Sequence, residues 1–227
     1  MKPLLKPAKA IALMPNLLKN ALVLCWVILL GSEAYGQKKE ALIRLDEGVT
    51  LLNKGKFNDA YMKFSEGIAI DASIADLHFG KANCAYRLNM FDTAITAVNK
   101  AIELKGEESE LYDLKGNVYF RARKYTEAIE SFSKAITLNP KSKKKIHLLN
   151  TYYNRGSCYL LLKEYKNGLK DFDKAIEMNP KFAQAYHNRG VCYIRLNKLN
   201  EGCNDMKKAS SMGSARSAKY IEDYCES

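Results

Sequence analysis

The side chains best suited to metal binding or nucleophilic catalysis in this sequence are six cysteines and three histidines. None of His78, His147 and His187 has a second metal-type ligand at a spacing typical of a metal site. No glycine-rich phosphate loop follows a strand pattern, and no serine, histidine and aspartate can be singled out as a catalytic set. The sequence therefore predicts a protein that is not an enzyme and uses no metal or other cofactor.

The first 36 residues have the order of a secretory signal peptide. Four lysines precede an unbroken apolar run over residues 21–30, and small residues follow at Ala34 and Gly36. This run is shorter than the roughly 20 apolar residues that a bilayer span needs. We expect cleavage near Gly36 and an exported protein, periplasmic or secreted, with no stable membrane span afterwards. An uncleaved membrane anchor is the alternative.

The charge balance limits the possible partners. The whole chain carries a net charge of +11, and removal of residues 1–36 takes away four lysines and one glutamate and leaves +8. Such a balance permits acidic partners or a membrane surface. We expect no nucleic-acid partner, because an exported protein rarely meets nucleic acid.

Two nearly identical segments, FSKAITLNP at residues 132–140 and FDKAIEMNP at residues 172–180, indicate an internal repeat. Units of 34 residues tile the chain and leave only residues 143–148 outside, as an insertion. The units span residues 41–74, 75–108, 109–142, 149–182 and 183–216.

Each unit has the pattern of two helices separated by a turn. In the third unit, the apolar residues within 125–138 fall on one face of a helix. Asn-Pro closes the third and fourth units, and proline often follows a helix end. A mid-helix glycine costs about 1 kcal/mol against alanine, which is tolerable where helices cross closely. The eighth place of the successive units holds such small residues: Gly48, Ala82, Gly116, Gly156 and Gly190.

A helix–turn–helix unit of this length, with small residues, aromatics and a closing proline at these places, resembles the tetratricopeptide repeat (TPR). The resemblance covers all five units, although the first two have Ala72 and Gly106 in place of the proline. It implies an all-α fold over residues 37–227. The expected architecture is a right-handed superhelical solenoid of five helix pairs, closed by a capping helix over residues 217–225.

In the TPR family, the first helices of the units line a concave groove that binds peptides or partner helices. The resemblance therefore implies a non-catalytic scaffold for a protein or peptide, and the alternatives are a chaperone-like assembly factor or a glycan or cell-wall binding module. Arginines at one shared place are expected to form a basic line for acidic groups, and asparagines can pair with a peptide backbone. The implied groove residues are Asn83, Tyr86, Arg87, Asn117, Phe120, Arg121, Tyr153, Asn154, His187, Asn188 and Arg195.

Lysines gather in and beside the insertion, at Lys141, Lys143, Lys144 and Lys145. This run fits a solvated loop or helix extension, and it also fits a contact with an acidic partner or a phosphate. A lysine run alone does not decide between them.

Five cysteines follow residue 36, and their places in the units predict their redox states. Cys84, Cys158 and Cys192 share the tenth place, where neighbouring helices are about 8–10 Å apart, and a disulfide needs Cα atoms within about 7 Å. We therefore expect three buried thiols. Cys203 begins an inward helix face and Cys225 ends the last helix, so antiparallel packing brings them together as a disulfide or as two buried thiols.

Overall fold

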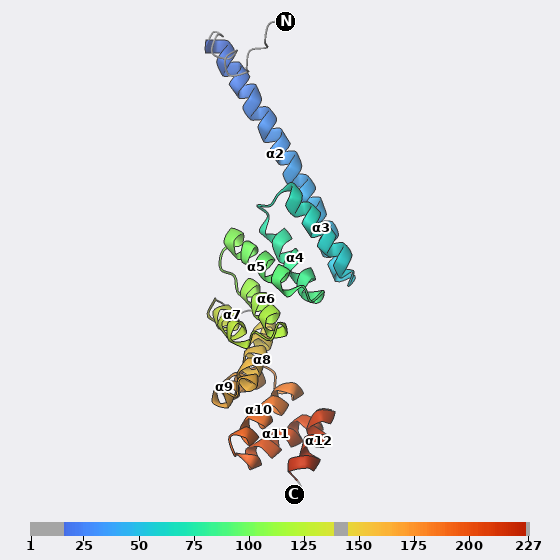
Figure 1. The fold of residues 1–227 in the computed structure, drawn as a ribbon, viewed down its shortest axis with the longest axis vertical. Coiled ribbons are helices and arrows are strands. Elements are labelled where there is room, and N and C mark those ends of the chain that lie inside the picture. Colours follow the sequence, from blue (N-terminus) through green and yellow to red (C-terminus); the bar gives the residue numbers. More distant parts are fainter. Residues whose placement is uncertain (1–15, 139–144, 226–227) are drawn as a thin grey trace.

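The computed structural model describes residues 16–138 and 145–225, which form eleven helices and no strand. In chain order they are α2 (Asn16–Asn53), α3 (Phe57–Ile70), α4 (Ala75–Arg87), α5 (Phe91–Lys105), α6 (Ser109–Arg121), α7 (Tyr125–Leu138), α8 (Lys145–Leu161), α9 (Tyr165–Met178), α10 (Ala183–Arg195), α11 (Leu199–Ser211) and α12 (Ala215–Tyr224). Consecutive helices pack as pairs, and the pairs stack into an elongated solenoid with α2 and α12 at opposite ends (Figure 1). The predicted all-α solenoid of helix pairs is confirmed.

The first helix begins earlier than the repeat pattern predicts. α2 starts at Asn16, runs without a break into the first repeat and projects beyond α3 (Figure 1). The expected cleavage position near Gly36 lies inside this helix. Within residues 16–138 and 145–225, no helix has the length and apolarity of a membrane span.

The insertion lengthens one helix. α8 begins at Lys145 and has 17 residues, whereas α4, α6 and α10 have 13 each. The end of the insertion is therefore part of the first helix of the fourth repeat. The remaining lysines of the run, at positions 141, 143 and 144, lie outside the described residues. At the other end, the capping helix α12 spans Ala215–Tyr224, where residues 217–225 were expected.

Every repeat turns between its two helices at the same place, with one residue in the left-handed backbone region. In the second repeat, this residue is Asn89 (φ 62°), and Met90 N–H donates to the carbonyl of Ala85 at 2.9 Å. This is the Schellman arrangement that satisfies the last carbonyls of a helix. The equivalent residues of the other repeats are Gly55, Arg123, Lys163 and Asn197. The turn is therefore set by hydrogen bonding, and residues other than glycine adopt it.

The core follows a size rule within each repeat. A Cβ atom added to Gly116 would lie 2.6 Å from the ring of Phe132, and one added to Gly48 would lie 2.6 Å from the ring of Phe64. Both rings are fully buried. In the second repeat the equivalent pair is Ala82 and Val98, so a larger residue on the first helix faces a smaller one on the second. The side chains at the eighth and twenty-fourth places of a repeat are thus matched in size, and we call this the size rule.

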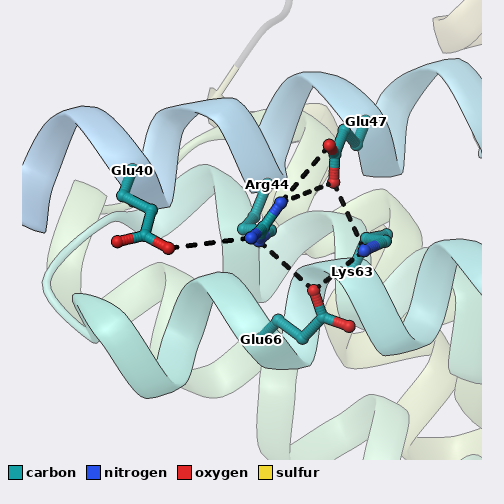
Figure 2. Close-up of polar contacts among 5 residues, drawn as sticks. All are labelled: Glu40, Arg44, Glu47, Lys63 and Glu66. Atoms are coloured by element: carbon teal, nitrogen blue, oxygen red, sulfur yellow. Dashed lines mark hydrogen bonds and ion pairs between the residues drawn. The ribbon is translucent and has the colours of Figure 1, made fainter.

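Charged side chains hold α2 against α3. Figure 2 shows Arg44 of α2 beside Glu40 and Glu47 of its own helix and Glu66 of α3, with Nε to Oε2 of Glu66 at 3.3 Å. Lys63 of α3 contacts Glu47 at 3.4 Å and Glu66 at 3.0 Å. All five groups keep partial solvent contact. The network therefore adds modest stability and fixes how the two helices pair.

The C-terminal end is closed by a covalent bond. Cys203 of α11 and Cys225, which follows α12, are joined as a disulfide with a Cα–Cα distance of 5.8 Å. This is the pair expected from their places in the repeat. The hydroxyl of Ser214 caps α12 by accepting from Ser217 N–H at 3.3 Å. The disulfide thus attaches the C-terminal end of α12 to α11, and the cap satisfies a backbone N–H group at its N-terminal end.

Candidate binding groove

The first helices of the second, third and fourth repeats line a groove of about 570 Å³. It contains five of the residues implied by the TPR resemblance: Asn83, Tyr86, Arg87, Asn117 and Asn154. The other lining residues are Leu52, Phe79, Glu110, Asp113, Leu114 and Asn150. Apart from Leu52 of α2 and the two residues at the end of α4, the lining residues occupy the second, fifth, sixth and ninth places of their units. One inner face of the stacked helices therefore supplies almost the whole lining.

Hydrogen bonds between side chains fix the polar groups of this groove. Asp113 accepts from Asn117 Nδ2 at 3.0 Å and from Thr151 Oγ1 of α8 at 2.6 Å. Asn154 Nδ2 of α8 donates to Asn117 Oδ1 at 2.8 Å. These bonds join α6 to α8, so the amides are held in position before any ligand arrives. Preorganised polar groups bind with less loss of side-chain entropy.

The three arginines that were expected to form one basic line lie in three different settings. Arg87 lines the groove and lies 5.8 Å from the centre of the Tyr86 ring. Arg121 lies 5.1 Å from the same ring, donates to the carbonyl of Tyr86 at 3.3 Å and also donates to Asn89 Oδ1. It lines a separate cavity of about 480 Å³ at the turns of the second and third repeats. Arg195 is exposed at the end of α10 and lies outside the lining of these cavities.

The three arginines separate because a long side chain at the end of a helix can reach beyond its own repeat. Each of these arginines is the last residue of its helix. The long side chain of Arg121 reaches back to the preceding repeat and packs on Tyr86. Phe120 is likewise placed against the core of its own repeat, with its ring 5.9 Å from that of Tyr125. Of the residues expected at the ends of α4 and α6, only those of α4 line the groove.

The remaining implied residues lie together in another cavity, between α8, α10 and α12. Tyr153, His187 and Asn188 line this space of about 310 Å³, together with Gln184, Ser214, Ala215 and Arg216. Asn188 Nδ2 donates to the hydroxyl of Tyr153 at 3.2 Å. The capping helix and its N-cap residue supply three of the seven lining residues. The sequence pattern of the repeats did not indicate that this helix takes part in a cavity.

The sequence reasoning also missed two buried ion pairs that hold repeats together. Arg155 donates two hydrogen bonds to Asp171, at 2.8 Å and 2.7 Å, and a third to Ser133 of the preceding repeat at 2.9 Å. Burial raises the pKa of Asp171, and the bonds from Arg155 oppose that rise. The fifth repeat has the same arrangement, with Arg189 bound to Asp205 and to Asp173 of the fourth repeat. The shared separation of 16 residues was the available signal.

The cysteines outside the disulfide offer little reactivity. Cys84, Cys158 and Cys192 are fully buried free thiols. Burial raises the pKa of Cys84 to about 11 and the pKa of Cys158 and Cys192 to about 12. At neutral pH they are therefore protonated, and a thiol is a weak nucleophile. In the described part of the chain, no three His, Cys, Asp or Glu residues are grouped to hold a metal ion.

A stack of helix pairs with a polar inner groove defines the class of α-helical repeat proteins. Sequence models of the tetratricopeptide repeat match residues 75–108, 114–142, 149–182 and 172–204, which together cover just over half of the chain. The chain therefore belongs to the tetratricopeptide repeat family. A search of curated proteins finds no match.

Solved structures of TPR proteins share this fold. One is YrrB, described as a TPR protein with an unusual peptide-binding site, at 19% identity over 82% of this chain and 93% of that one, with a TM-score of 0.70. A MamA protein matches at 23% identity over 80% and 96%, with a TM-score of 0.68. MamA from Desulfovibrio magneticus RS-1 matches at 16% identity over 76% and 94%, with a TM-score of 0.69. Identities this low show likeness of fold alone.

Proposed function

We propose that this protein is a non-catalytic scaffold that holds a segment of a partner protein in the groove between α4, α6 and α8. The observation that carries the proposal is the set of asparagines Asn83, Asn117 and Asn154, which line a single groove beside Tyr86. Amide side chains offer both a donor and an acceptor to a peptide backbone. YrrB, which has the same fold, is described as having a peptide-binding site, and this likeness supports the same function here.

The charges of the groove suggest how a bound segment is oriented. Arg87 provides the cation at one end, and Glu110 and Asp113 provide carboxylates within the same groove. An acidic group of the partner would be favoured beside Arg87 and disfavoured beside Asp113. We therefore propose a segment of mixed charge, with its acidic group placed at the Arg87 end.

Selection of peptides from a displayed library on the full chain tests this function. Bound peptides are expected to lose affinity on Arg87→Gln by up to about fivefold in Kd, because Arg87 is exposed and an exposed ion pair is worth about 0.2–1 kcal/mol. Lys170→Gln is the matched control, because Lys170 is an exposed cation on the outer helix α9. Equal loss or no loss in both variants would place the binding site elsewhere.

A second arm of the experiment addresses the geometry. A photo-crosslinking residue in place of Tyr86 should capture the selected peptide, whereas the same residue in place of Lys166 on α9 should not. Tyr86 lines the groove, and Lys166 is exposed on a second helix. Capture by the α9 position alone would refute the groove as the binding surface.

We further propose that the protein acts outside the cytoplasm, in the periplasm or as a secreted protein. The order of charges and apolar residues in positions 1–36 supports export. The disulfide between Cys203 and Cys225 adds to this, because such bonds persist in oxidising compartments. Fractionation of cells and N-terminal sequencing of the purified protein test both points, and an intact N-terminus in the cytoplasmic fraction would refute them.

A further inference from the structure

The two ends of the helical stack are finished differently. At the C-terminal end, α12 covers the fifth repeat, and its exposed residues include four charged side chains: Arg216, Lys219, Glu222 and Asp223. At the N-terminal end, α2 is the outermost helix of the repeats, and the described helices α3 and α4 pack against one side of it (Figure 1). A terminal repeat needs a polar outer face to stay soluble. The side of α2 turned away from α3 is therefore the place to look for an unfilled interface.

Ile43 marks the place where the first repeat lacks a neighbour. It occupies the third place of its unit, and the residues at this place in the later repeats are Leu77, Leu111, Thr151 and Ala185. These four are at most 3% exposed, whereas Ile43 is 48% exposed. The side chain of Leu77 lies against Gly67, in the second helix of the preceding repeat. The third place thus packs one repeat on the one before it, and no described helix covers it in the first repeat.

The outer face of α2 carries charged residues beside this apolar one. Leu42 is adjacent to Ile43 and is 45% exposed. Lys39 and Asp46 lie on the same face, because residues three, four and seven positions apart share one side of a helix. Both are exposed, and neither forms an ion pair with another residue in the described part of the chain. The face therefore has an apolar centre with a cation on one side and an anion on the other.

This order of residues is complementary to itself when it is reversed. Lys39 precedes Leu42 by three residues, and Asp46 follows Ile43 by three. In an antiparallel pair of these helices, with the two-fold axis between Leu42 and Ile43, each Leu42 is opposite Ile43 of the second copy. The same register sets each Lys39 opposite Asp46 of the second copy, so two ion pairs enclose four apolar side chains. A parallel pair would instead set like charges together.

We propose that the outer face of α2 is a dimer interface, on which α2 of a second copy packs in the antiparallel orientation. The charge complementarity of Lys39 and Asp46 is the observation that selects this occupant. Both residues follow Gly36, so removal of residues 1–36 would leave the interface in place. The interface uses none of the residues that line the groove between α4, α6 and α8. A dimer would therefore present two grooves, and a partner with two binding segments would gain avidity.

The other occupant that the chain itself offers is α12 of a further copy. A head-to-tail contact of this kind does not close and would extend into a filament. It would also set charged residues of α12, such as Lys219 and Glu222, against Ile43. Burial of charges without partners is unfavourable. The two-fold contact between α2 helices avoids this cost and ends at two copies.

Sedimentation velocity of the full chain over a wide range of concentration tests the oligomeric state. We expect a monomer–dimer equilibrium that stops at two copies and weakens as salt is added, because the ion pairs are exposed. A chain that stays monomeric at every concentration would overturn the proposal. Growth beyond two copies would indicate head-to-tail stacking and would overturn it as well.

Charge reversal tests the register. Asp46→Lys should weaken the dimer by about tenfold, because two attractive contacts become repulsive. Lys39→Asp combined with Asp46→Lys should restore the dimer, because the charges are complementary again. A double variant as weak as Asp46→Lys alone would show that the two residues do not face each other, and the proposed register would be wrong.

Replacement of the apolar centre tests the location of the interface. Leu42→Gln combined with Ile43→Gln should leave the chain monomeric at concentrations where the parent is a dimer. The matched control is Leu161→Gln combined with Leu199→Gln, which removes leucines that are 51% and 49% exposed at the turns of other repeats. The control should dimerise as the parent does, and both variants should keep the helical circular dichroism of the parent. Equal dimerisation of the two variants would place the interface elsewhere.

Cross-linking with a short bis-maleimide determines the orientation. A mixture of the Lys39→Cys and Asp46→Cys variants should give a cross-linked dimer that joins one chain of each kind. Cross-linking of Lys39→Cys chains to each other would indicate parallel helices and refute the antiparallel contact. The native cysteines do not interfere, because those outside the disulfide are buried. None of these measurements involves Arg87, so the dimer can be confirmed or refuted whatever the outcome of the peptide experiments.

Discussion

Replacement of Gly116 by alanine tests the size rule of the core most directly. The added Cβ would lie 2.6 Å from two atoms of the buried Phe132 ring, so the ring must shift within a packed interior. Such overpacking costs about 1–3 kcal/mol. The higher helix propensity of alanine offsets about 1 kcal/mol of that cost. We expect a net loss of up to about 2 kcal/mol in the free energy of unfolding.

The second repeat supplies the compensating change. There alanine faces valine at the same two places, as Ala82 and Val98. Phe132→Val alone should cost about 2–4 kcal/mol, because it leaves a cavity beside Gly116. In the double variant the new methyl group fills part of that cavity. The double variant should therefore be more stable than the sum of the two losses predicts, by at least about 1 kcal/mol.

Urea denaturation followed by circular dichroism measures this coupling, with midpoints compared at an unchanged slope. The mismatched combination of Gly48→Ala with Phe132→Val is the control, because Gly48 faces Phe64 in a different repeat. Its two losses should add. If the losses in free energy of unfolding are also additive for Gly116→Ala with Phe132→Val, the two side chains are not matched in size, and the size rule is wrong.

Three further outcomes are expected. A non-reduced digest analysed by mass spectrometry should contain the Cys203–Cys225 cross-linked peptide, and a digest with both thiols free would refute the bond. Cys225→Ser should lower the free energy of unfolding by about 3 kcal/mol, given the separation of 22 residues. Lys163→Gly should raise the free energy of unfolding by about 0.5–1 kcal/mol, because lysine is strained at φ 63° and glycine is not; a loss would mean that its side chain stabilises the turn. The lowered pKa of His187 means that its imidazole binds fewer protons in the folded state than in the unfolded state. The contribution of this residue to stability should therefore be constant above about pH 7 and be lost as the pH drops through about 6.5. A His187→Gln variant with the same acid dependence as the parent would refute this source.

The sequence predicted those features that depend on spacing along one chain. The period of the units placed each pair of helices, and the shared tenth place of Cys84, Cys158 and Cys192 indicated buried thiols. Antiparallel packing of two neighbouring helices predicted that Cys203 and Cys225 lie together, but it left open whether they form a disulfide or remain two thiols. Each of these predictions depends on the spacing of residues along the repeats, and the folded molecule keeps that spacing.

Features that depend on the reach of a side chain or on the capping helix could not be predicted. Arg121 was assigned to the groove by its place, but its length lets it pack on Tyr86 and bond to Asn89. The cavity between α8, α10 and α12 exists because α12 closes the space beside His187 and Asn188. No period governs that closure, because the capping helix is not a repeat.

The arginine pairs of the last two repeats also set an order among the units. Arg155 binds Ser133 and Arg189 binds Asp173, and both acceptors are at the twenty-fifth place of the preceding repeat. The fifth repeat has Lys207 at that place, exposed on α11. A sixth unit copied from the fifth would set its arginine against this lysine, so duplication of the last unit would join two cations. Repulsion between these two cations would therefore disfavour a further copy of the last unit at this end of the stack. The interior units do not have this conflict with their neighbours.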